Sequence, residues 1–177
     1  DLLAQVLNVG KPIVLDADAL NLIAAEPGLQ QKIVRRKGAT VLTPHPLEAA
    51  RLLDQTTDEI QADRLSTARL LAKQFNATVI LKGSGSVIAQ PTGEAFVNPT
   101  GNPALATAGT GDVLAGICGA LLAQGWPVRD AALGATWLHG AAADDLVAQG
   151  IGPIGIAACE LLPAIRARLN VLTTQFG

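Results

Sequence analysis

The sequence predicts an α/β fold, in which helices cover both faces of a mostly parallel sheet that has a hairpin at one edge. Short apolar runs rich in Val and Ile, typical of buried strands, alternate along the chain with longer stretches of helical periodicity. Apolar residues make up 49% of the chain and charged residues only 16%, so a substantial core can form. The length of 177 residues favours a single domain.

Two strands, each followed by a helix, are predicted for the first part of the chain. The pattern of residues 1–7 is typical of the end of an amphipathic helix. The strands are predicted at 12–15 and 39–43, and the helices at 19–25, 46–53 and 58–75. Pro44 closes the second strand because it has no amide proton for the sheet, and Pro46 opens the next helix.

A hairpin and three helices are predicted for the remainder. A strand at 78–82 turns through Gly83-Ser84-Gly85 into a strand at 86–89. A turn at 91–94 then leads into a strand at 95–98. The helical patterns beyond the hairpin cover 113–124, 128–147 and 156–169.

The composition excludes several classes of protein. The formal net charge is −2 and the pI about 5.6, whereas nonspecific binding of nucleic acid needs a basic face. Aromatic residues, at 3%, are too few to stack single-stranded bases. No apolar run reaches the roughly 20 residues of a membrane helix. We therefore expect a cytoplasmic protein that binds neither nucleic acid nor membrane.

Two further expectations concern the chain and its neighbours. Met is absent and the sequence opens inside a helical pattern, so we expect a piece of a longer protein. Small residues dominate the predicted helix between Ala131 and Ala148, and exposed faces of that kind allow close contacts between subunits. We therefore expect a homo-oligomer.

The most informative segment runs from Asn102 to Asp112, where a glycine turn and a carboxylate precede an apolar helix. Gly109 and Gly111 permit positive φ and close approach of a ligand, so their N–H groups can face negative charge. The helix dipole favours an anion at the same place. A carboxylate repels an anion, so Asp112 suits a general base that takes a proton from a hydroxyl. Thr110 and Asp112 are equally typical of helix caps, and this alternative stays open.

A second motif, Lys82-Gly83-Ser84-Gly85-Ser86, follows the third predicted strand. It offers backbone N–H groups, hydroxyls and a cation on one turn, which suits a nucleotide phosphate or ribose. Its composition alone favours an ordinary hairpin turn with a solvated lysine.

Two histidines differ in their surroundings. His45 stands between two prolines in a stiff loop after a strand, where a space-filling role is unexpected. Glu48, three residues later, can serve the helix dipole or a cap. His139 falls among small residues of a helix and is expected to be a hydrogen-bonded core histidine.

Polar residues follow the other predicted strands as well. Asp18 is predicted to cap the helix after the first strand. For Asp16 two predictions stay open: it binds a metal-bound water or substrate hydroxyls, or it caps the same helix. Ligands of open α/β sheets bind at the carboxyl ends of the strands. We therefore expect these motifs to meet in one cleft.

Four stretches resemble the ribokinase-like superfamily and, more narrowly, its NAD(P)H-hydrate dehydratases, the carboxyl-terminal domain of the bifunctional NAD(P)H-hydrate repair enzyme. In family order they are VLDADALN at 14–21, VLTPHPLEAARLL at 41–53, LKGSGSVIA at 81–89 and GNPALATAGTGDVLAGICGALLAQG at 101–125. The resemblance implies a three-layer αβα ribokinase-like fold that lacks its N-terminal part. Residues 1–177 would then be the carboxyl-terminal portion of one dehydratase domain.

The resemblance also implies roles for individual residues. His45, Asn102 and Asp112 match contacts with the hydrated nicotinamide nucleotide, and Asp112 is the implied catalytic residue. An adenine nucleotide, ADP or ATP, is implied to bind Lys82, Gly83, Ser84, Gly85, Ser86 and Gly111. The implied anion hole consists of Gly109, Thr110 and Gly111. Mg²⁺ is implied as the companion of the nucleotide, with its protein ligands unknown.

The chain departs from the family spelling at two places. Leu47 stands where Gly is commoner, and residues 108–112 read AGTGD where GxSGD or GGSGD is commoner. Thr110 keeps the hydroxyl, so no reacting group is lost. His45 replaces an asparagine that is typical of kinase relatives, which favours the dehydratase.

The implied reaction is nucleotide-dependent dehydration of NADHX or NADPHX, the 6-hydroxy hydrates of NADH and NADPH. ADP would become AMP, or ATP would become ADP, with release of phosphate. In the bifunctional form such a domain is fused to an N-terminal NAD(P)H-hydrate epimerase domain. Two alternatives remain: a small-molecule kinase of the superfamily, of the hydroxymethylpyrimidine type, and a catalytically silent nucleotide-binding module.

Overall fold

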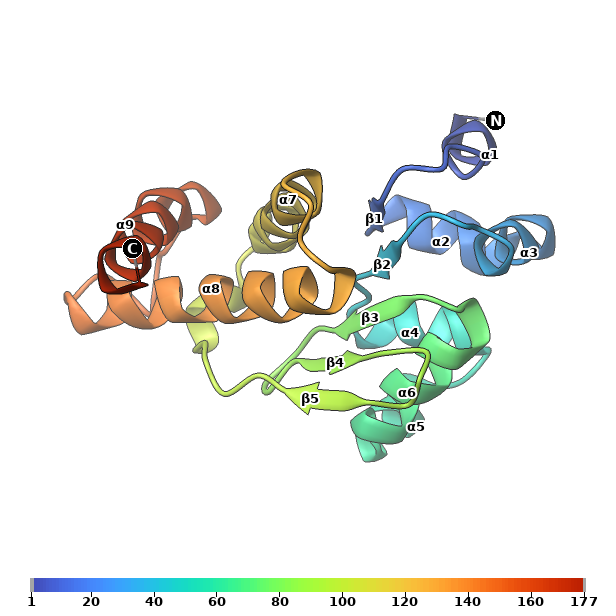
Figure 1. The fold of residues 1–177 in the computed structure, drawn as a ribbon. Helices are drawn as coiled ribbons and strands as arrows, with labels where there is room; N and C mark the ends of the chain where they lie inside the picture. The colour runs from blue at the N-terminus through green and yellow to red at the C-terminus, as the bar shows by residue number, and fades with distance from the viewer. Residues whose placement is uncertain (1, 177) are drawn as a thin grey trace.

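A five-stranded mixed sheet forms the centre of the fold (Figure 1). The computed structural model of the chain describes residues 2–176. The strands lie side by side in sequence order, as β1 (Ile13–Leu15), β2 (Thr40–Leu42), β3 (Thr78–Leu81), β4 (Val87–Ala89) and β5 (Ala95–Val97). β1, β2 and β3 run parallel, whereas β3, β4 and β5 pair antiparallel. The predicted strands and the hairpin at one edge are confirmed.

Helices cover both faces of this sheet (Figure 1). One face carries α2 (Asp18–Ala25), α3 (Pro27–Val34), α4 (Pro46–Leu53), α5 (Thr57–Ala62) and α6 (Arg64–Phe75). The opposite face carries α7 (Thr110–Ala123) and α8 (Val128–Ala148), and α9 (Leu161–Phe176) packs on α8. The short helices are α1 (Leu2–Val6), η1 (Pro103–Ala106) and η2 (Ala158–Glu160).

The strands are apolar on both sides because both sides are covered. Val41 and Ile80 pack against α7 and α8, while their neighbours Leu42 and Leu81 pack into the core on the other face. All four side chains are fully buried. This alternation is the period-two pattern of a strand, and the apolar character of both faces is typical of parallel sheets between helices.

Four helical segments differ from the prediction. In place of the helix predicted at 156–169, η2 covers Ala158–Glu160 and α9 covers Leu161–Phe176. The helix predicted at 58–75 is two helices, because Asp63 leaves the helical conformation and its carboxylate accepts a hydrogen bond from the Ser66 N–H at 2.9 Å. α3 lies where no helix is predicted, although Pro27 at its first position is a typical start signal. α7 begins at Thr110 rather than at Val113, which places Asp112 in the first turn.

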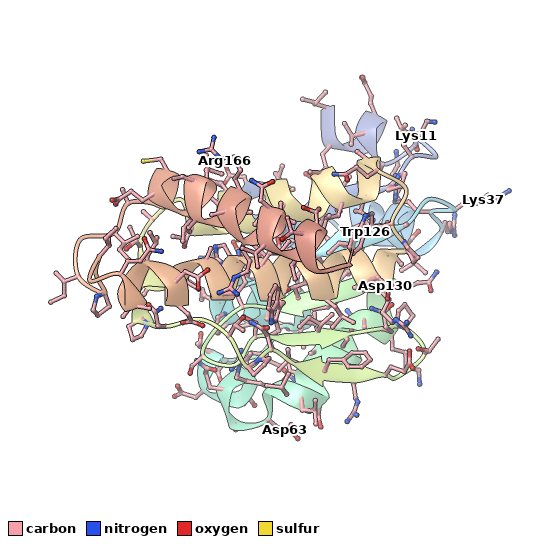
Figure 2. The ribbon with its side chains drawn as sticks, turned by 60° about the vertical axis from the view of Figure 1, so that its left-hand side comes forward. Lys11, Lys37, Asp63, Trp126, Asp130 and Arg166 are labelled. Carbon is pink, nitrogen blue, oxygen red and sulfur yellow. The ribbon has the colours of Figure 1, made fainter. Side chains whose placement is uncertain are left out.

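The small residues of α8 pack inside the chain. Ala132, Ala135 and Ala142 are fully buried, so they are not the exposed face on which self-association was expected. A homo-oligomer stays a prediction without that support. Elsewhere on the surface, the charged side chains of Lys11 and Lys37 point outward (Figure 2). Within residues 2–176, no helix combines the length and the apolar character needed to cross a bilayer.

His139 lies on the buried side of α8 and is held neutral. It is 7% exposed, and burial lowers the pKa of its imidazole to about 4. The charge of Lys82 acts in the same direction, and the Thr110 backbone acts against it. The predicted burial is confirmed, but the expected full hydrogen bonding is wrong, because Nε2 has no partner among the described residues.

Gly140 allows α8 to pack directly on the segment after β5, and we expect Gly140→Ala to destabilise the fold. A Cβ at Gly140 would lie 2.6 Å from the carbonyl carbon of Thr100. The free energy of unfolding should fall by about 1–3 kcal/mol, the usual cost of overpacking. Gly116→Ala on α7 is the matched control, because its Cβ would meet open space and gain up to about 1 kcal/mol of helix propensity. Urea unfolding compares the two, and equal stabilities would contradict the close contact.

The neutral His139 should make stability depend on pH between 6.5 and about 4. The folded pKa lies below the unfolded one, so the unfolded state binds the proton first as the pH falls. Stability is therefore unaffected above pH 6.5 and falls toward pH 4, by at most about 3 kcal/mol. His139→Gln should flatten this part of the urea-unfolding profile. A pH profile that runs parallel to the wild type would contradict the burial effect.

Candidate active site

Three polar segments meet at the carboxyl ends of the parallel strands. Lys82 follows β3, and its Nζ lies 2.7 Å from Asp16 Oδ1 and 3.8 Å from Glu48 Oε2. Asp16 follows β1, and Glu48 lies in the first turn of α4, which follows β2. These segments meet as predicted, but of them only the loop that begins at Lys82 lines the cavity described below, so the prediction of one common cleft is wrong. Lys82 is not a freely solvated lysine, because its side chain is only 20% exposed.

His45 caps α4 with its own side chain. Nδ1 accepts hydrogen bonds from the N–H groups of Leu47 (3.1 Å) and Glu48 (3.2 Å), and the Glu48 carboxylate accepts one from the His45 N–H at 2.8 Å. An accepting Nδ1 carries no proton, so Nε2 carries it in the neutral ring. Nε2 lies 3.4 Å from Glu48 Oε1, and the side chain is 47% exposed. The outer edge of the ring can therefore donate to a ligand.

Asp16 faces the site rather than α2. Its Oδ1 accepts hydrogen bonds from Lys82 Nζ and, at 2.9 Å, from the Ala17 N–H. The residue that precedes α2 is Ala17, with φ 48°, and it makes no side-chain cap. The predicted cap by Asp18 is wrong, because the helix starts at Asp18 and so includes it in the first turn.

The glycine turn has the predicted form at Gly109 but not at Gly111. Gly109 has φ 86° and immediately precedes α7, whereas Gly111 lies inside the first turn with helical φ. Thr110 Oγ1 donates to the Leu105 carbonyl at 2.8 Å and anchors the turn. In the described part of the chain, the N–H groups of Gly111 and Asp112 meet no acceptor. Both can therefore face an anion.

Gly111 joins the glycine turn to the Lys82 cluster. A Cβ at Gly111 would lie 3.4 Å from Lys82 Nζ and 3.5 Å from Asp16 Oδ2. The start of α7 therefore lies against the ion pair. A ligand at this point meets one cation and the amide groups of a helix start.

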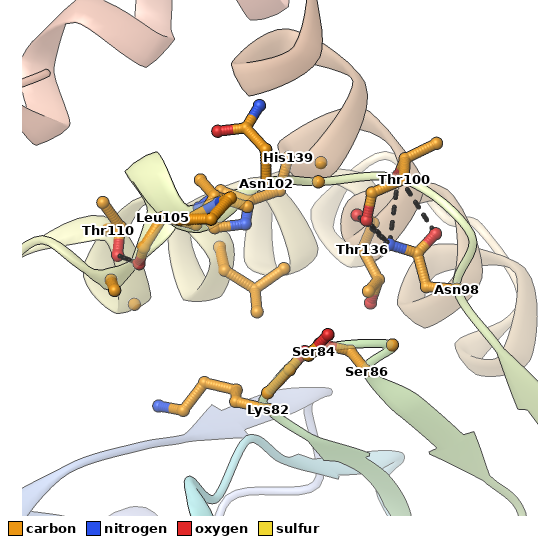
Figure 3. A pocket seen from close by; sticks show the side chains of 18 residues that line it. Lys82, Ser84, Ser86, Asn98, Thr100, Asn102, Leu105, Thr110, Thr136 and His139 are labelled. Carbon is orange, nitrogen blue, oxygen red and sulfur yellow. Dashed lines mark hydrogen bonds between the residues drawn. The ribbon is translucent and has the colours of Figure 1, made fainter. Parts of the chain in front are cut away.

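A cavity of about 390 Å³ lies beside the cluster (Figure 3). Its walls are the loop at 82–86, the segment at 98–106, the start of α7 and the middle of α8. Figure 3 shows Lys82 and Ser84 on one side, and Leu105 and His139 on the other. The size and the mixture of apolar walls with a few polar groups are typical of small-molecule sites.

The predicted site residues divide between the cavity and its outside. All six predicted nucleotide contacts line it, namely Lys82, Gly83, Ser84, Gly85, Ser86 and Gly111. Asn102 and Thr110 line it as well. Gly109, Asp112 and His45 do not, and the Asp112 side chain is exposed one residue beyond Gly111.

Asn102 is engaged by its own segment. Its Nδ2 donates to Asp144 Oδ1 at 2.9 Å, and its Oδ1 accepts from the Ala104 N–H at 3.0 Å. Asp144 also accepts from the Gly101 N–H at 2.9 Å. These bonds fix the wall of the cavity and leave Asn102 only part of its hydrogen-bonding capacity for a ligand.

Four polar residues of the cavity wall carry no motif that sequence reasoning could use. They are Asn98, Thr100, Thr136 and His139. Asn98 Nδ2 donates to the Thr100 carbonyl at 3.0 Å, and Thr100 Oγ1 donates to the Trp137 carbonyl at 3.1 Å (Figure 3 shows the first). Only the packing of α8 brings these groups together, and the small residues around His139 were the one available signal.

The Asp16 carboxylate is suited to a metal ion that is held mainly by the phosphates of a ligand. Residues 2–176 contain no group of three or more His, Cys, Asp or Glu side chains placed to hold an ion. Mg²⁺ commonly keeps several waters and takes one or two protein carboxylates together with substrate phosphates. Asp16 Oδ2 fits that pattern, because it faces the start of α7 while Oδ1 pairs with Lys82.

Known proteins resemble this chain closely in sequence. The family model described as NAD(P)H-hydrate dehydratase matches residues 1–166. The ADP-dependent (S)-NAD(P)H-hydrate dehydratase of Neisseria meningitidis is 48% identical over 163 residues, which cover 92% of this chain and 55% of the relative. The bifunctional NAD(P)H-hydrate repair enzyme Nnr of Escherichia coli is 41% identical over 173 residues, 98% of this chain and 32% of that enzyme. The chain thus spans about half the length of the first relative and a third of the second.

Solved structures share the fold. The ADP/ATP-dependent NAD(P)H-hydrate dehydratase from Bacillus subtilis, co-crystallised with ATP/Mg²⁺, has a TM-score of 0.85 at 34% identity over 96% of this chain and 58% of its own. A ribokinase-like superfamily protein from Enterococcus faecalis has a TM-score of 0.79 at 27% identity, over 96% of this chain and 57% of its own. The predicted ribokinase-like fold is confirmed. Since the family model matches nearly the whole sequence, the chain belongs to the NAD(P)H-hydrate dehydratase family.

Proposed function

We propose that the protein containing this chain is a hydro-lyase that dehydrates NADHX and NADPHX to NADH and NADPH at the expense of ADP or ATP. The observation that supports this most directly is the position of Gly111, which lines the cavity and also lies against Lys82 and Asp16. A transferring phosphate there would meet a cation and helix N–H groups, with the Asp112 carboxylate in the same helical turn.

The cavity suits the adenine nucleotide. The loop at 82–86 supplies N–H groups and hydroxyls, and Leu105 and Leu114 supply apolar surface for a base. The polar end at Lys82 and Gly111 suits the phosphates. The names of the relatives, ADP-dependent in Neisseria meningitidis and ADP/ATP-dependent in Bacillus subtilis, support this choice of nucleotide.

The hydrate is proposed to bind outside the cavity, where His45 and Asp112 are exposed. His45 Nε2 carries a proton when Nδ1 accepts from the backbone, so it can donate to an oxygen of the hydrated ring. Asn102, which lines the cavity, is proposed to reach the substrate with the hydrogen-bonding capacity that Asp144 and Ala104 leave free. Gly111 then lies between the two ligands, which is where the phosphoryl group must pass.

Hydroxide is a poor leaving group at neutral pH, and phosphorylation replaces it with phosphate. Asp112 takes the proton of the ring hydroxyl while the hydroxyl oxygen attacks the terminal phosphorus of the nucleotide. The phosphoanhydride bond to that phosphorus breaks, which leaves AMP or ADP. The N–H groups of Gly111 and Asp112, which meet no acceptor in the described part of the chain, stabilise the charge of the transferred group. Of the predicted anion hole, the Thr110 N–H already donates to the Thr107 carbonyl at 3.4 Å. The ring nitrogen lone pair then expels inorganic phosphate, and a proton lost from the neighbouring ring carbon restores the reduced nicotinamide.

Mg²⁺ accompanies the nucleotide in this proposal and neutralises part of the charge on its phosphates. Asp16, with Glu48 behind it, would hold the ion or its bound waters. Lys82 supplies a fixed positive charge beside them.

The wider protein is inferred from the sequence predictions together with the names of its relatives. Residues 1–177 form, in this proposal, the carboxyl-terminal portion of one dehydratase domain of a cytoplasmic, self-associating enzyme. Curated relatives include both an ADP-dependent dehydratase and the bifunctional repair enzyme. Fusion to an N-terminal epimerase domain is therefore one of two arrangements that fit the chain.

The full-length protein, mixed with NADHX, Mg²⁺ and ADP or ATP, is expected to restore the absorbance of reduced nicotinamide. Inorganic phosphate should appear in equal amount, because each turnover releases one phosphate. A stable phosphorylated product without restored absorbance would indicate a kinase instead, the alternative that the likeness to hydroxyethylthiazole kinase from Pyrococcus horikoshii favours (26% identity, TM-score 0.67). Nucleotide binding with neither product would indicate a module without catalysis.

Asp112→Asn is expected to lower turnover by about 10²–10⁴-fold, because the amide keeps the shape of the side chain but takes up no proton. Calorimetry should show that ADP and the hydrate both still bind, because the amide oxygen can still accept a hydrogen bond from the ring hydroxyl. Asp130→Asn is the matched control, because Asp130 is the third residue of α8 as Asp112 is of α7. Unchanged turnover in Asp112→Asn would remove Asp112 from the role of base.

A further inference from the structure

Arg64, the first residue of α6, contacts the loop at 82–86 from outside the cavity. Its Nη1 donates to the Ser84 carbonyl, and its Nη2 donates to the Leu81 carbonyl at 3.2 Å. Arg64 does not line the cavity, whereas every residue of the loop does. Both hydrogen bonds go to backbone carbonyls, one in the loop and one at the end of β3.

The orientation of a peptide unit gives this contact a consequence for the cavity. The C=O of Ser84 and the N–H of Gly85 belong to one planar trans peptide and point in opposite directions. Because Arg64 binds the carbonyl, the Gly85 N–H points away from Arg64. Gly85 lines the cavity, and its N–H meets no acceptor within the described chain.

Gly83 shows how closely the guanidinium approaches the loop. It has φ 145°, a conformation that side chains rarely adopt, and a Cβ there would lie 2.8 Å from Arg64 Nη2. The planar fork of an arginine spans two carbonyls at once, which a lysine ammonium on its flexible stem does not reproduce. Both the glycine and the fork are thus required by this geometry.

The geometry points to Arg64 as a positioning residue, which turns the Gly85 N–H toward an acceptor group of a nucleotide in the cavity. This inference rests on the proposed nucleotide site. Arg64 touches no reacting group, and it acts by fixing the Ser84–Gly85 peptide. Its loss should weaken nucleotide binding while the chemistry of a fully bound enzyme continues.

The chain offers a matched control on the same helix. Arg69 Nε donates to the Gly93 carbonyl at 3.0 Å, so it also binds α6 to a turn of the hairpin, but at a turn that does not line the cavity. Arg69→Met removes the same charge and the same kind of contact as Arg64→Met. Arg64→Lys keeps the charge and most of the stem but removes the fork.

The test measures ADP binding by calorimetry and steady-state kinetics in the full-length protein and its variants. Arg64→Met and Arg64→Lys should each weaken ADP binding about tenfold, as expected for a lost charge-assisted hydrogen bond. The KM for hydrate and kcat at saturating nucleotide should stay within about twofold, and Arg69→Met should bind ADP like the wild type. If Arg64→Met does not fold, as judged by circular dichroism, Arg64→Lys carries the comparison.

Three results would overturn the inference. Wild-type affinity in Arg64→Lys would show that only the charge matters. Equal losses in Arg64→Met and Arg69→Met would show a general effect on the hairpin. A wild-type protein that binds ADP but yields no NADH from the hydrate would refute the proposed function alone, whereas one that binds no adenine nucleotide would refute the site and the role of Arg64 together.

Discussion

The ion pair between Lys82 and Asp16 is the interaction around which the site is arranged. Its partners are 66 residues apart and meet only because β1, β2 and β3 are parallel and in register, with Leu15 opposite Leu42 and Leu42 opposite Val79. A one-residue slip of β3 would turn its side chains to the opposite faces and remove Lys82 from the cluster. The pair is largely shielded from solvent, so salt screens it less than a surface pair. The apolar core therefore sets the electrostatics of the site.

Much of the fold could be predicted, because its signals are local. Strands such as Thr78–Leu81 are short runs of β-branched and apolar residues, and Pro46 marks the start of α4. The break at Asp63 could not be read from periodicity, since the apolar stripe continues across it while the carboxylate caps a new helix. Helix starts were similarly displaced at α7, where Thr110 and Gly111 adopt helical backbone before the apolar run begins. A backbone choice made by one polar residue leaves little trace in a hydrophobic pattern.

The residues of the site also fall into those that the sequence could predict and those that it could not. The residues next to strand ends, such as Asp16, His45 and Lys82, were recognisable because the position after a parallel strand is itself a signal. The capping bond of His45 was not, because a histidine is an unusual cap and its Nδ1 geometry depends on the two prolines around it. The α8 wall at Thr136 and His139 was also hidden, since it depends on how two layers dock rather than on any local sequence.

The walls of the cavity come from two layers of the molecule, the sheet and the helices packed on one of its faces. The loop at 82–86 extends from the sheet, whereas Leu114, Thr136 and His139 belong to the helices packed on it. A molecule bound in the cavity contacts both layers, so it can bind only while the helices are packed on the sheet. By mass action, occupancy then stabilises the docked arrangement selectively. Partial opening of α7 and α8, as seen by amide exchange, would thus be suppressed by a ligand more strongly than fraying of α2 or α3. The cavity gives the protein a stability that rises and falls with the concentration of what it binds.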